Sequence, residues 1–83
     1  MKITLKLFAS LADYLPPGAS HNQVQVEVPD GATPAMVLAQ FKVPPQLAHL
    51  VMINGVYVSP EERETRRLEP EQQFAVFPPV AGG

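Results

Sequence analysis

The 83-residue chain contains no cysteine and no tryptophan, and it carries little excess charge of either sign. Without cysteine there can be no disulfide, no thiolate metal site, no iron–sulfur cluster and no cysteine nucleophile. The formal net charge of −2 argues against a general nucleic-acid-binding protein, which would normally present a basic face. No apolar run approaches the roughly 18 residues of a membrane span, and the first residues do not resemble a signal peptide. We therefore expect a cytoplasmic protein with neither nucleic acid nor membrane as a partner.

Proline is the residue in excess, since 10 prolines stand mostly between short apolar runs. They punctuate short elements and do not form a polyproline ligand or a low-complexity linker. Hydrophobic residues make up 46% of the chain, which is too many for a disordered segment. Length and composition together predict one domain over residues 1–83, too small to enclose a large active site. Binding is therefore favoured over catalysis.

Short β-strands are the main elements that the sequence pattern predicts. Five segments have the pattern of a strand, which is either a strict alternation of polar and apolar residues or a short β-prone run bounded by turn residues. They are residues 2–8, 23–28, 51–53, 56–58 and 74–77. The dipeptide Asn54-Gly55 separates the third and fourth segments. Because both positions of a tight hairpin turn favour positive φ, this dipeptide predicts a β-hairpin.

Helices are expected in the intervals between these strands. Thr33 followed by Pro34 is a helix start, with the cap and the first-turn proline in the expected order, and Pro44-Pro45 is expected to end that helix. Ser10 is expected to cap a short helical turn before the next prolines. A second capped turn is expected after Ser59, where Glu62 completes a capping pattern.

These elements predict an α+β fold in which a mixed sheet of about five strands carries one main helix across one face. The first and last strands are expected to be central and parallel, as in a β-grasp (ubiquitin-like) domain. Alternation then assigns one set of side chains to the face beneath the helix: Ile3, Leu5, Leu7, Val56, Val58, Phe74 and Val76. The opposite set has no helix to cover it: Phe8, Tyr57, Ala75 and Phe77.

An exposed apolar patch on a small domain usually marks a partner surface, and aromatic residues are enriched at interface cores. We therefore expect Phe8, Tyr57 and Phe77 to contact a partner protein. Two other interpretations stay open at this point. Short helical turns could cover one or two of these side chains, or the strand register could differ by one residue.

The end of the sequence carries the most specific signal, because it reads Phe77-Pro78-Pro79-Val80-Ala81-Gly82-Gly83. A di-glycine has no side chains, so an extended backbone could pass through a channel too narrow for a Cβ atom. Residues 78–83 could reach about 20 Å when extended, and the paired prolines would stiffen the base of this flexible tail. The reactive group would be the α-carboxylate of Gly83, which is inert until it is activated. A frayed terminus without function is the alternative.

These residues, together with the Ile53-Asn54-Gly55 hairpin and the isolated Leu68, resemble the small sulfur-carrier subunits of molybdopterin synthase in the ubiquitin-like MoaD/ThiS family. The resemblance spans essentially the whole chain in element order. It implies that Gly83 is adenylated with ATP by an E1-like adenylyltransferase and converted to a thiocarboxylate, with Gly82 as the slender link behind it. No bound cofactor or metal is implied.

The resemblance also implies a partner and a product. The tail would enter the large subunit of molybdopterin synthase, in a heterotetramer, and donate sulfur to precursor Z to form molybdopterin. The large subunit would carry the catalytic residues. The partner-binding residues of this chain would be three aromatic residues and the tail residues before the di-glycine: Phe8, Tyr57, Phe77, Pro78, Pro79, Val80 and Ala81.

Several alternatives remain open on the sequence alone. A sibling carrier would deliver sulfur to thiamine, to tRNA or to another metabolite, whereas a ubiquitin-like modifier would form isopeptide bonds through Gly83. A plain interaction module is the third alternative. The chain departs from the family at residues 69–72, where an Asp-Gly-Asp turn is common, and the charged stretch 60–67 is longer than in many relatives. His21 and His49 lack metal-ligand spacing, so we expect no metal site.

Overall fold

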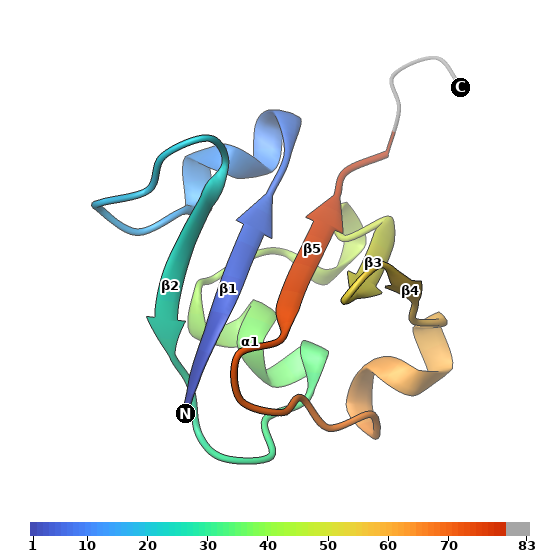
Figure 1. Cartoon of the computed structure of the whole chain (residues 1–83). Helices are drawn as coiled ribbons and strands as arrows, with labels where there is room; N and C mark the ends of the chain where they lie inside the picture. Colours follow the sequence, from blue (N-terminus) through green and yellow to red (C-terminus); the bar gives the residue numbers. More distant parts are fainter. Residues whose placement is uncertain (80–83) are drawn as a thin grey trace.

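Five strands form one mixed sheet in the order β2-β1-β5-β3-β4 (Figure 1). The structure is a computed structural model, and residues 1–79 are the part of the chain that it describes. The strands are β1 (Lys2–Leu7), β2 (Gln23–Glu27), β3 (Leu50–Ile53), β4 (Val56–Tyr57) and β5 (Gln73–Phe77). β1 and β5 pair in parallel at the centre, and the other neighbours pair antiparallel. The predicted sheet and its central parallel pair are therefore confirmed.

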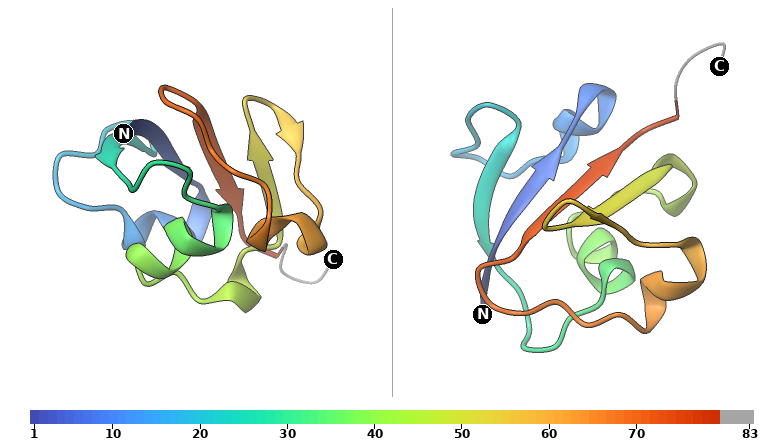
Figure 2. Two further views of the ribbon diagram at one scale, coloured as in Figure 1. Left: turned by 90° about the horizontal axis from the view of Figure 1, so that it is seen from below. Right: turned by 45° about the vertical axis from the view of Figure 1, so that its right-hand side comes forward.

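One α-helix, α1 (Pro34–Gln40), crosses a single face of this sheet (Figure 2). Its start is as predicted, because the Thr33 hydroxyl accepts a hydrogen bond from the Met36 N–H at 3.3 Å and Pro34 lies in the first turn. Three short 3₁₀ helices complete the elements, namely η1 (Ala9–Tyr14), η2 (Pro45–Leu47) and η3 (Pro60–Glu64).

The end of α1 differs from the expectation, because the helix ends at Gln40 and not at Pro44-Pro45. Lys42 has a left-handed φ of 60°, and its N–H donates to the Ala39 carbonyl at 3.1 Å. The Val43 N–H reaches back to the Leu38 carbonyl at 2.9 Å. This pair of bonds is a Schellman motif, which satisfies the last helical carbonyls and reverses the chain before the prolines. Lysine stands where glycine is usual.

The prediction for Ser10 is also wrong. The helix η1 begins at Ala9, two residues earlier than a cap at Ser10 would place it; its N-cap residue is Phe8, and that cap has no side-chain hydrogen bond. The backbone explains the shift, because the Phe8 N–H donates to the Val76 carbonyl at 3.2 Å and keeps Phe8 extended beside β5. The chain then turns at Ala9, whose φ is 52°, so Ser10 already lies inside the first turn.

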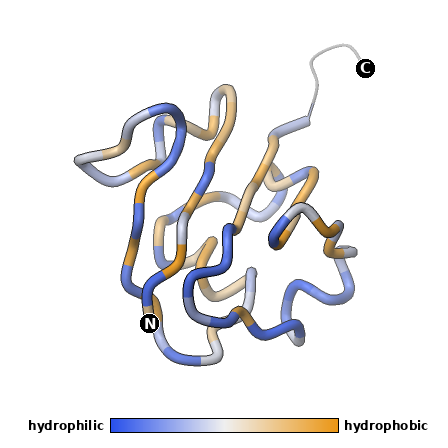
Figure 3. Tube along the Cα trace, in the orientation of Figure 1, coloured by the Kyte–Doolittle hydropathy of each residue, from blue (hydrophilic) through white to orange (hydrophobic). Residues whose placement is uncertain are grey.

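The core lies between the sheet and α1, and most of the residues assigned to it by alternation are buried there. Leu68 is 2% exposed, and its N–H donates to the Ala32 carbonyl at 2.8 Å. It anchors the stretch from η3 to β5, which is otherwise almost continuously hydrophilic (Figure 3). Val56 is the exception to the predicted core, since it is 56% exposed. It lies on the outermost strand β4 beside the hairpin turn, where the core no longer covers it.

The hairpin between β3 and β4 is confirmed. Asn54 and Gly55 have φ values of 49° and 78°, as a tight turn with two left-handed positions requires. The Asn54 side chain also accepts a hydrogen bond from the Gln73 N–H at 2.7 Å, which ties the turn to the start of β5.

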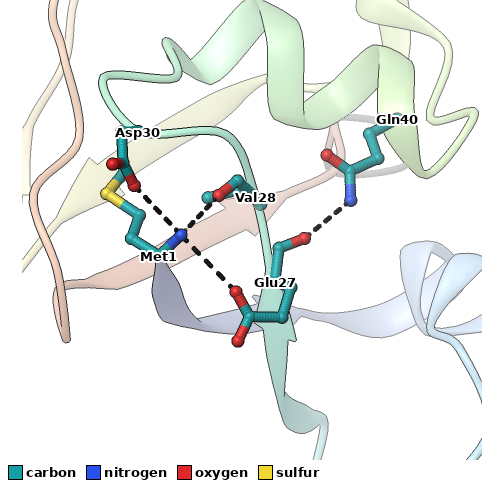
Figure 4. Close-up of polar contacts among 5 residues, drawn as sticks. All are labelled: Met1, Glu27, Val28, Asp30 and Gln40. Carbon is teal, nitrogen blue, oxygen red and sulfur yellow. Dashed lines mark hydrogen bonds and ion pairs between the residues drawn. The ribbon is translucent and has the colours of Figure 1, made fainter.

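A cluster of polar contacts holds the first residue beside the end of β2 (Figure 4). The Met1 α-ammonium donates to the Val28 carbonyl at 2.7 Å and lies 3.2 Å from an Asp30 carboxylate oxygen and 3.4 Å from a Glu27 carboxylate oxygen. The hydrogen bond to Asp30 is the largest cause that raises the pKa of this ammonium from its ordinary value of 8.0, and Glu27 adds to it. Gln40 donates to the Glu27 carbonyl at 2.9 Å, which links α1 to β2.

Candidate partner-binding surface

The face of the sheet turned away from α1, which we call the open face, carries an apolar patch. Cross-strand register defines it, since directly opposite residues share a face of a sheet. Met52 lies opposite both Tyr57 and Ala75, and Leu50 lies opposite Phe77. Phe8 continues the alternation of β1 in an extended conformation. The apolar patch therefore consists of Phe8, Leu50, Met52, Tyr57, Ala75 and Phe77.

Two aromatic rings form the centre of the apolar patch. The rings of Phe8 and Phe77 stack with centroids 4.4 Å apart and an interplanar angle of 2°. Each ring covers part of the other, so both side chains are half-buried. Tyr57 has no such neighbour and is 53% exposed. The structure thus brings the three predicted aromatic residues to one face, two in direct contact and the third across β3.

The remainder of the open face is polar. Opposite pairs at the β2 side of the sheet are Thr4 with Gln25 and Lys6 with Gln23, while Lys6 also lies opposite Ala75. The apolar patch is therefore confined to the half of the face formed by β3, β4 and the ends of β1 and β5. Such a one-sided distribution is typical of a docking surface with a polar rim.

β5 leads directly from the apolar patch into the predicted tail. Phe77 is its last residue, and the Phe77 carbonyl accepts a hydrogen bond from the His49 N–H at 2.9 Å. Pro78 and Pro79 follow, and neither has an N–H with which to extend the sheet. Pro78 is half-buried and Pro79 is exposed. The predicted site residues Val80, Ala81, Gly82 and Gly83 lie outside the described residues.

Sequence reasoning missed two members of the apolar patch, Leu50 and Met52. Their signal was present, because Met52 faces Tyr57 across a hairpin whose register the Asn-Gly turn fixes. No predicted site residue lines the cavity of about 300 Å³ formed by Ala35, Leu38, Pro45, Pro60, Arg63 and Glu64. Within residues 1–79, no cluster of three or more histidine, aspartate or glutamate residues could hold a metal ion.

A mixed sheet with a central parallel pair of terminal strands and one helix across a face defines a β-grasp, ubiquitin-like protein. The sequence comparison is more specific, because the ThiS family model matches residues 5–83. The chain therefore belongs to the ThiS family. Comparison with the curated proteins finds no match.

Solved structures agree with this fold. SAMP1 from Haloferax volcanii is 27% identical, with a TM-score of 0.67 and full coverage of both chains. The HVO 2177 protein, also from Haloferax volcanii, is 27% identical with a TM-score of 0.77, over 100% of this chain and 87% of that one. A Pyrococcus furiosus protein described as molybdopterin converting factor, subunit 1, shares the fold at 23% identity, with a TM-score of 0.62 and coverage of 95% and 98%. In residues 1–79, no helix is long and apolar enough to cross a membrane.

Proposed function

We propose that this protein is a sulfur carrier whose C-terminal Gly83 bears the sulfur as a thiocarboxylate. The observation that carries the proposal is the continuity of the apolar patch with the tail: Phe77 belongs to the patch, and the next residues are Pro78-Pro79 and then the segment that ends in Gly82-Gly83. A partner that docks on the patch would thus receive the tail at a fixed point of entry. Membership of the ThiS family supports the same function.

The chemistry requires an activating enzyme, because a carboxylate does not react with sulfur nucleophiles. A Gly83 carboxylate oxygen attacks the α-phosphorus of ATP on an E1-like adenylyltransferase, and pyrophosphate leaves. A sulfur nucleophile then attacks the carbonyl carbon of the acyl-adenylate, and AMP leaves. With hydrosulfide as the nucleophile the product is the thiocarboxylate itself. With a persulfide the product is an acyl disulfide, and a second thiol attacks the outer sulfur, releases the thiocarboxylate and leaves as a disulfide with the donor. The role of this chain is to present the carboxylate, and the absence of side chains at the di-glycine lets the backbone enter a narrow channel.

We further propose that the acceptor is precursor Z, held by the large subunit of molybdopterin synthase in a heterotetramer. The fold shared with the Pyrococcus furiosus molybdopterin converting factor subunit supports this choice of pathway. In this arrangement Phe8, Tyr57, Phe77 and Pro78 contact the large subunit, and that subunit supplies the catalytic residues.

A second candidate function is supported by the Haloferax volcanii structures. Two of them are small archaeal modifier protein 1, at 27% and 26% identity. A protein modifier would use the same activated Gly83, but the nucleophile would be a lysine amine and the product an isopeptide. Carriers for thiamine or tRNA thiolation would share the thiocarboxylate and differ only in the acceptor.

Deletion of Gly83 tests the proposal. We expect the truncated chain to lose sulfur transfer to precursor Z in a reconstituted synthase, while its melting temperature stays within about 2 °C, because the deletion removes none of the buried core residues between Ile3 and Val76. The Asp13→Asn variant, at an exposed position in η1, is the control and should transfer sulfur normally. Transfer by the truncated chain at the full rate would contradict the proposal. Recovery of the full-length chain on lysines, without transfer, would favour the modifier.

A further inference from the structure

The charged stretch that includes η3, which the proposed function does not use, contains one arginine with an unusual set of partners. Arg63 donates through Nη1 to the Ala48 carbonyl at 2.6 Å and through Nη2 to the His49 carbonyl at 3.1 Å. Within residues 1–79 the guanidinium makes no ion pair, and its buried Nε has no hydrogen-bond partner. Arg66, three residues further on, instead lies 3.9 Å from the Glu62 carboxylate.

The two carbonyls that Arg63 binds lie just after η2, where helical carbonyls have no partner within the helix. The N–H groups of this segment already bond to its own backbone, from Ala48 to the Pro45 carbonyl and from His49 to the Leu47 carbonyl, each at 3.1 Å. Arg63 binds the Ala48 and His49 carbonyls and so adds to the hold on the same two residues. The planar guanidinium can hold both oxygens at once, which a lysine ammonium at the end of a flexible chain does less well.

His49 connects this contact to the tail. While its carbonyl accepts from Arg63, its N–H donates to the Phe77 carbonyl at 2.9 Å and is shared with the Leu47 carbonyl at 3.1 Å. Phe77 is the last residue of β5, and the two prolines after it have no N–H. The hydrogen bond from His49 therefore lies at the point where β5 ends and the chain leaves the sheet.

Hydrogen bonds hold the chain on both sides of Arg63. The Glu62 carboxylate accepts from the Ser59 N–H at 3.3 Å and from its hydroxyl at 3.0 Å, which closes the start of η3. The Arg66 N–H donates to the Glu62 carbonyl at 2.8 Å, and the buried Leu68 anchors the segment after it. Because η3 is fixed in this way, the Arg63 guanidinium can hold the Ala48 and His49 carbonyls in a defined position.

We propose that Arg63 is a positioning residue for the C-terminal tail: it holds the 48–49 peptide groups and so fixes the His49–Phe77 hydrogen bond at the point where the tail departs. The consequence for sulfur transfer rests on the proposed function. The direction of the chain at Phe77, the last residue of β5, sets the direction in which the tail leaves the sheet. Fixing the base lowers the entropy lost when a partner grips the tail.

Amide hydrogen exchange of the full chain tests the structural part of this proposal without any partner. We expect Arg63→Met to lower the protection factor of the His49 amide at least tenfold relative to the Leu7 amide, which bonds to Asn22 at 3.0 Å on the other side of the sheet. Arg66→Met is the matched control and should leave that ratio unchanged. Equal loss at His49 and Leu7, or no loss at His49, would overturn the proposal. Should Arg63→Met fail to fold, Arg63→Lys is judged by the same ratio, with an expected intermediate loss.

Kinetics test the functional part. With the reconstituted synthase, Arg63→Met should raise the KM for the carrier about threefold to tenfold while kcat stays within twofold, because the channel aligns the tip once the tail is bound. Arg63→Lys should recover part of the loss. An unchanged KM in a variant whose His49 amide has lost protection would overturn the positioning role. If the wild-type chain transfers no sulfur, the proposed function fails, and the exchange ratio still decides whether Arg63 fixes the base of the tail.

Discussion

Substitution of Tyr57 should separate partner binding from folding more cleanly than any other change in the apolar patch. Its side chain is 53% exposed and lies on β4, a strand of two residues at the edge of the sheet. Phe8 and Phe77 are less suitable, because each supports the other by ring stacking. Truncation of either ring would weaken the fold and the surface together.

The magnitude for Tyr57→Ala follows from the exposed area. About half of a tyrosine's roughly 200 Å² remains in water, so a partner could bury about 100 Å² there. At about 25 cal/mol per Å² this area is worth about 2.5 kcal/mol, or about 60-fold in Kd. The unfolding free energy should fall by less than about 1 kcal/mol, since the free protein buries little of this side chain.

Isothermal titration calorimetry against the large subunit of molybdopterin synthase measures the first quantity, and urea unfolding measures the second. Gln25→Ala is the matched control, because Gln25 lies on the polar part of the same open face. It should change Kd less than twofold. The reasoning would be refuted if Tyr57→Ala bound as tightly as Gln25→Ala, or if its loss of stability matched its loss of binding.

Three further predictions concern the fold. Leu68→Ala should reduce the free energy of unfolding by about 3 kcal/mol and so lower the melting temperature by roughly 12–24 °C. The volume-conserving Leu68→Met should cost less than about 1.5 kcal/mol. A thermal scan in which the alanine variant melts less than about 5 °C below the wild type would contradict the anchoring role. Lys42→Gly should raise the free energy of unfolding, measured in urea, by about 0.5 kcal/mol. Glycine relieves about 1 kcal/mol of strain at the left-handed φ, but it also increases the entropy of the unfolded chain. Lys42→Ala should give no gain. The Met1 ammonium has a raised pKa in the folded state, so its contribution is complete below its ordinary value of 8.0 and is lost as pH rises through the folded value. The urea midpoint should therefore fall between about pH 7 and about pH 10 by more in the wild type than in Asp30→Asn, and an equal fall in both would count against this contact.

Local sequence rules were sufficient to predict an element wherever the residue type determines the backbone conformation. Asn54-Gly55 fixed the hairpin because both positions need positive φ, and Thr33-Pro34 fixed the start of α1 because cap and proline act within one turn. Such signals need no knowledge of distant segments. The layer arrangement followed from the need to cover one apolar face with one helix, whereas the parallel pair of β1 and β5 was expected only by analogy with β-grasp domains.

The errors arose where a distant contact overrides the local preference. Ser10 is a good cap, yet the hydrogen bond from Phe8 to Val76 keeps the chain extended up to that point. The Schellman motif at Lys42 ends α1 without a glycine, the residue that usually indicates such a helix end in a sequence. Val56 alternates correctly but lies beyond the edge of the core. The contribution of Arg63 was invisible in the sequence, because its partners are backbone carbonyls with no residue signature.

The same reasoning explains which part of the candidate surface could be predicted. Alternation alone assigned Phe8, Tyr57 and Phe77 to the open face, since the period of two applies within each strand. The hairpin register and the alternation along β3 also place Met52 and Leu50 on that face, but only the register between β3 and β5, two segments far apart in the chain, puts them opposite Ala75 and Phe77. The stacking of Phe8 on Phe77 likewise depends on the parallel pairing of β1 with β5.

The most direct test of the carrier function is the mass of the C-terminal peptide after incubation of the full chain with ATP, a sulfide source and the E1-like adenylyltransferase of the same organism. Exchange of oxygen for sulfur nearly equals the mass change of methionine oxidation, and the chain has 3 methionines, so the peptide must be fragmented. We predict sulfur on Gly83 and nowhere else. An unmodified Gly83 after exposure to an adenylyltransferase of demonstrated activity would contradict the proposal that this protein carries sulfur.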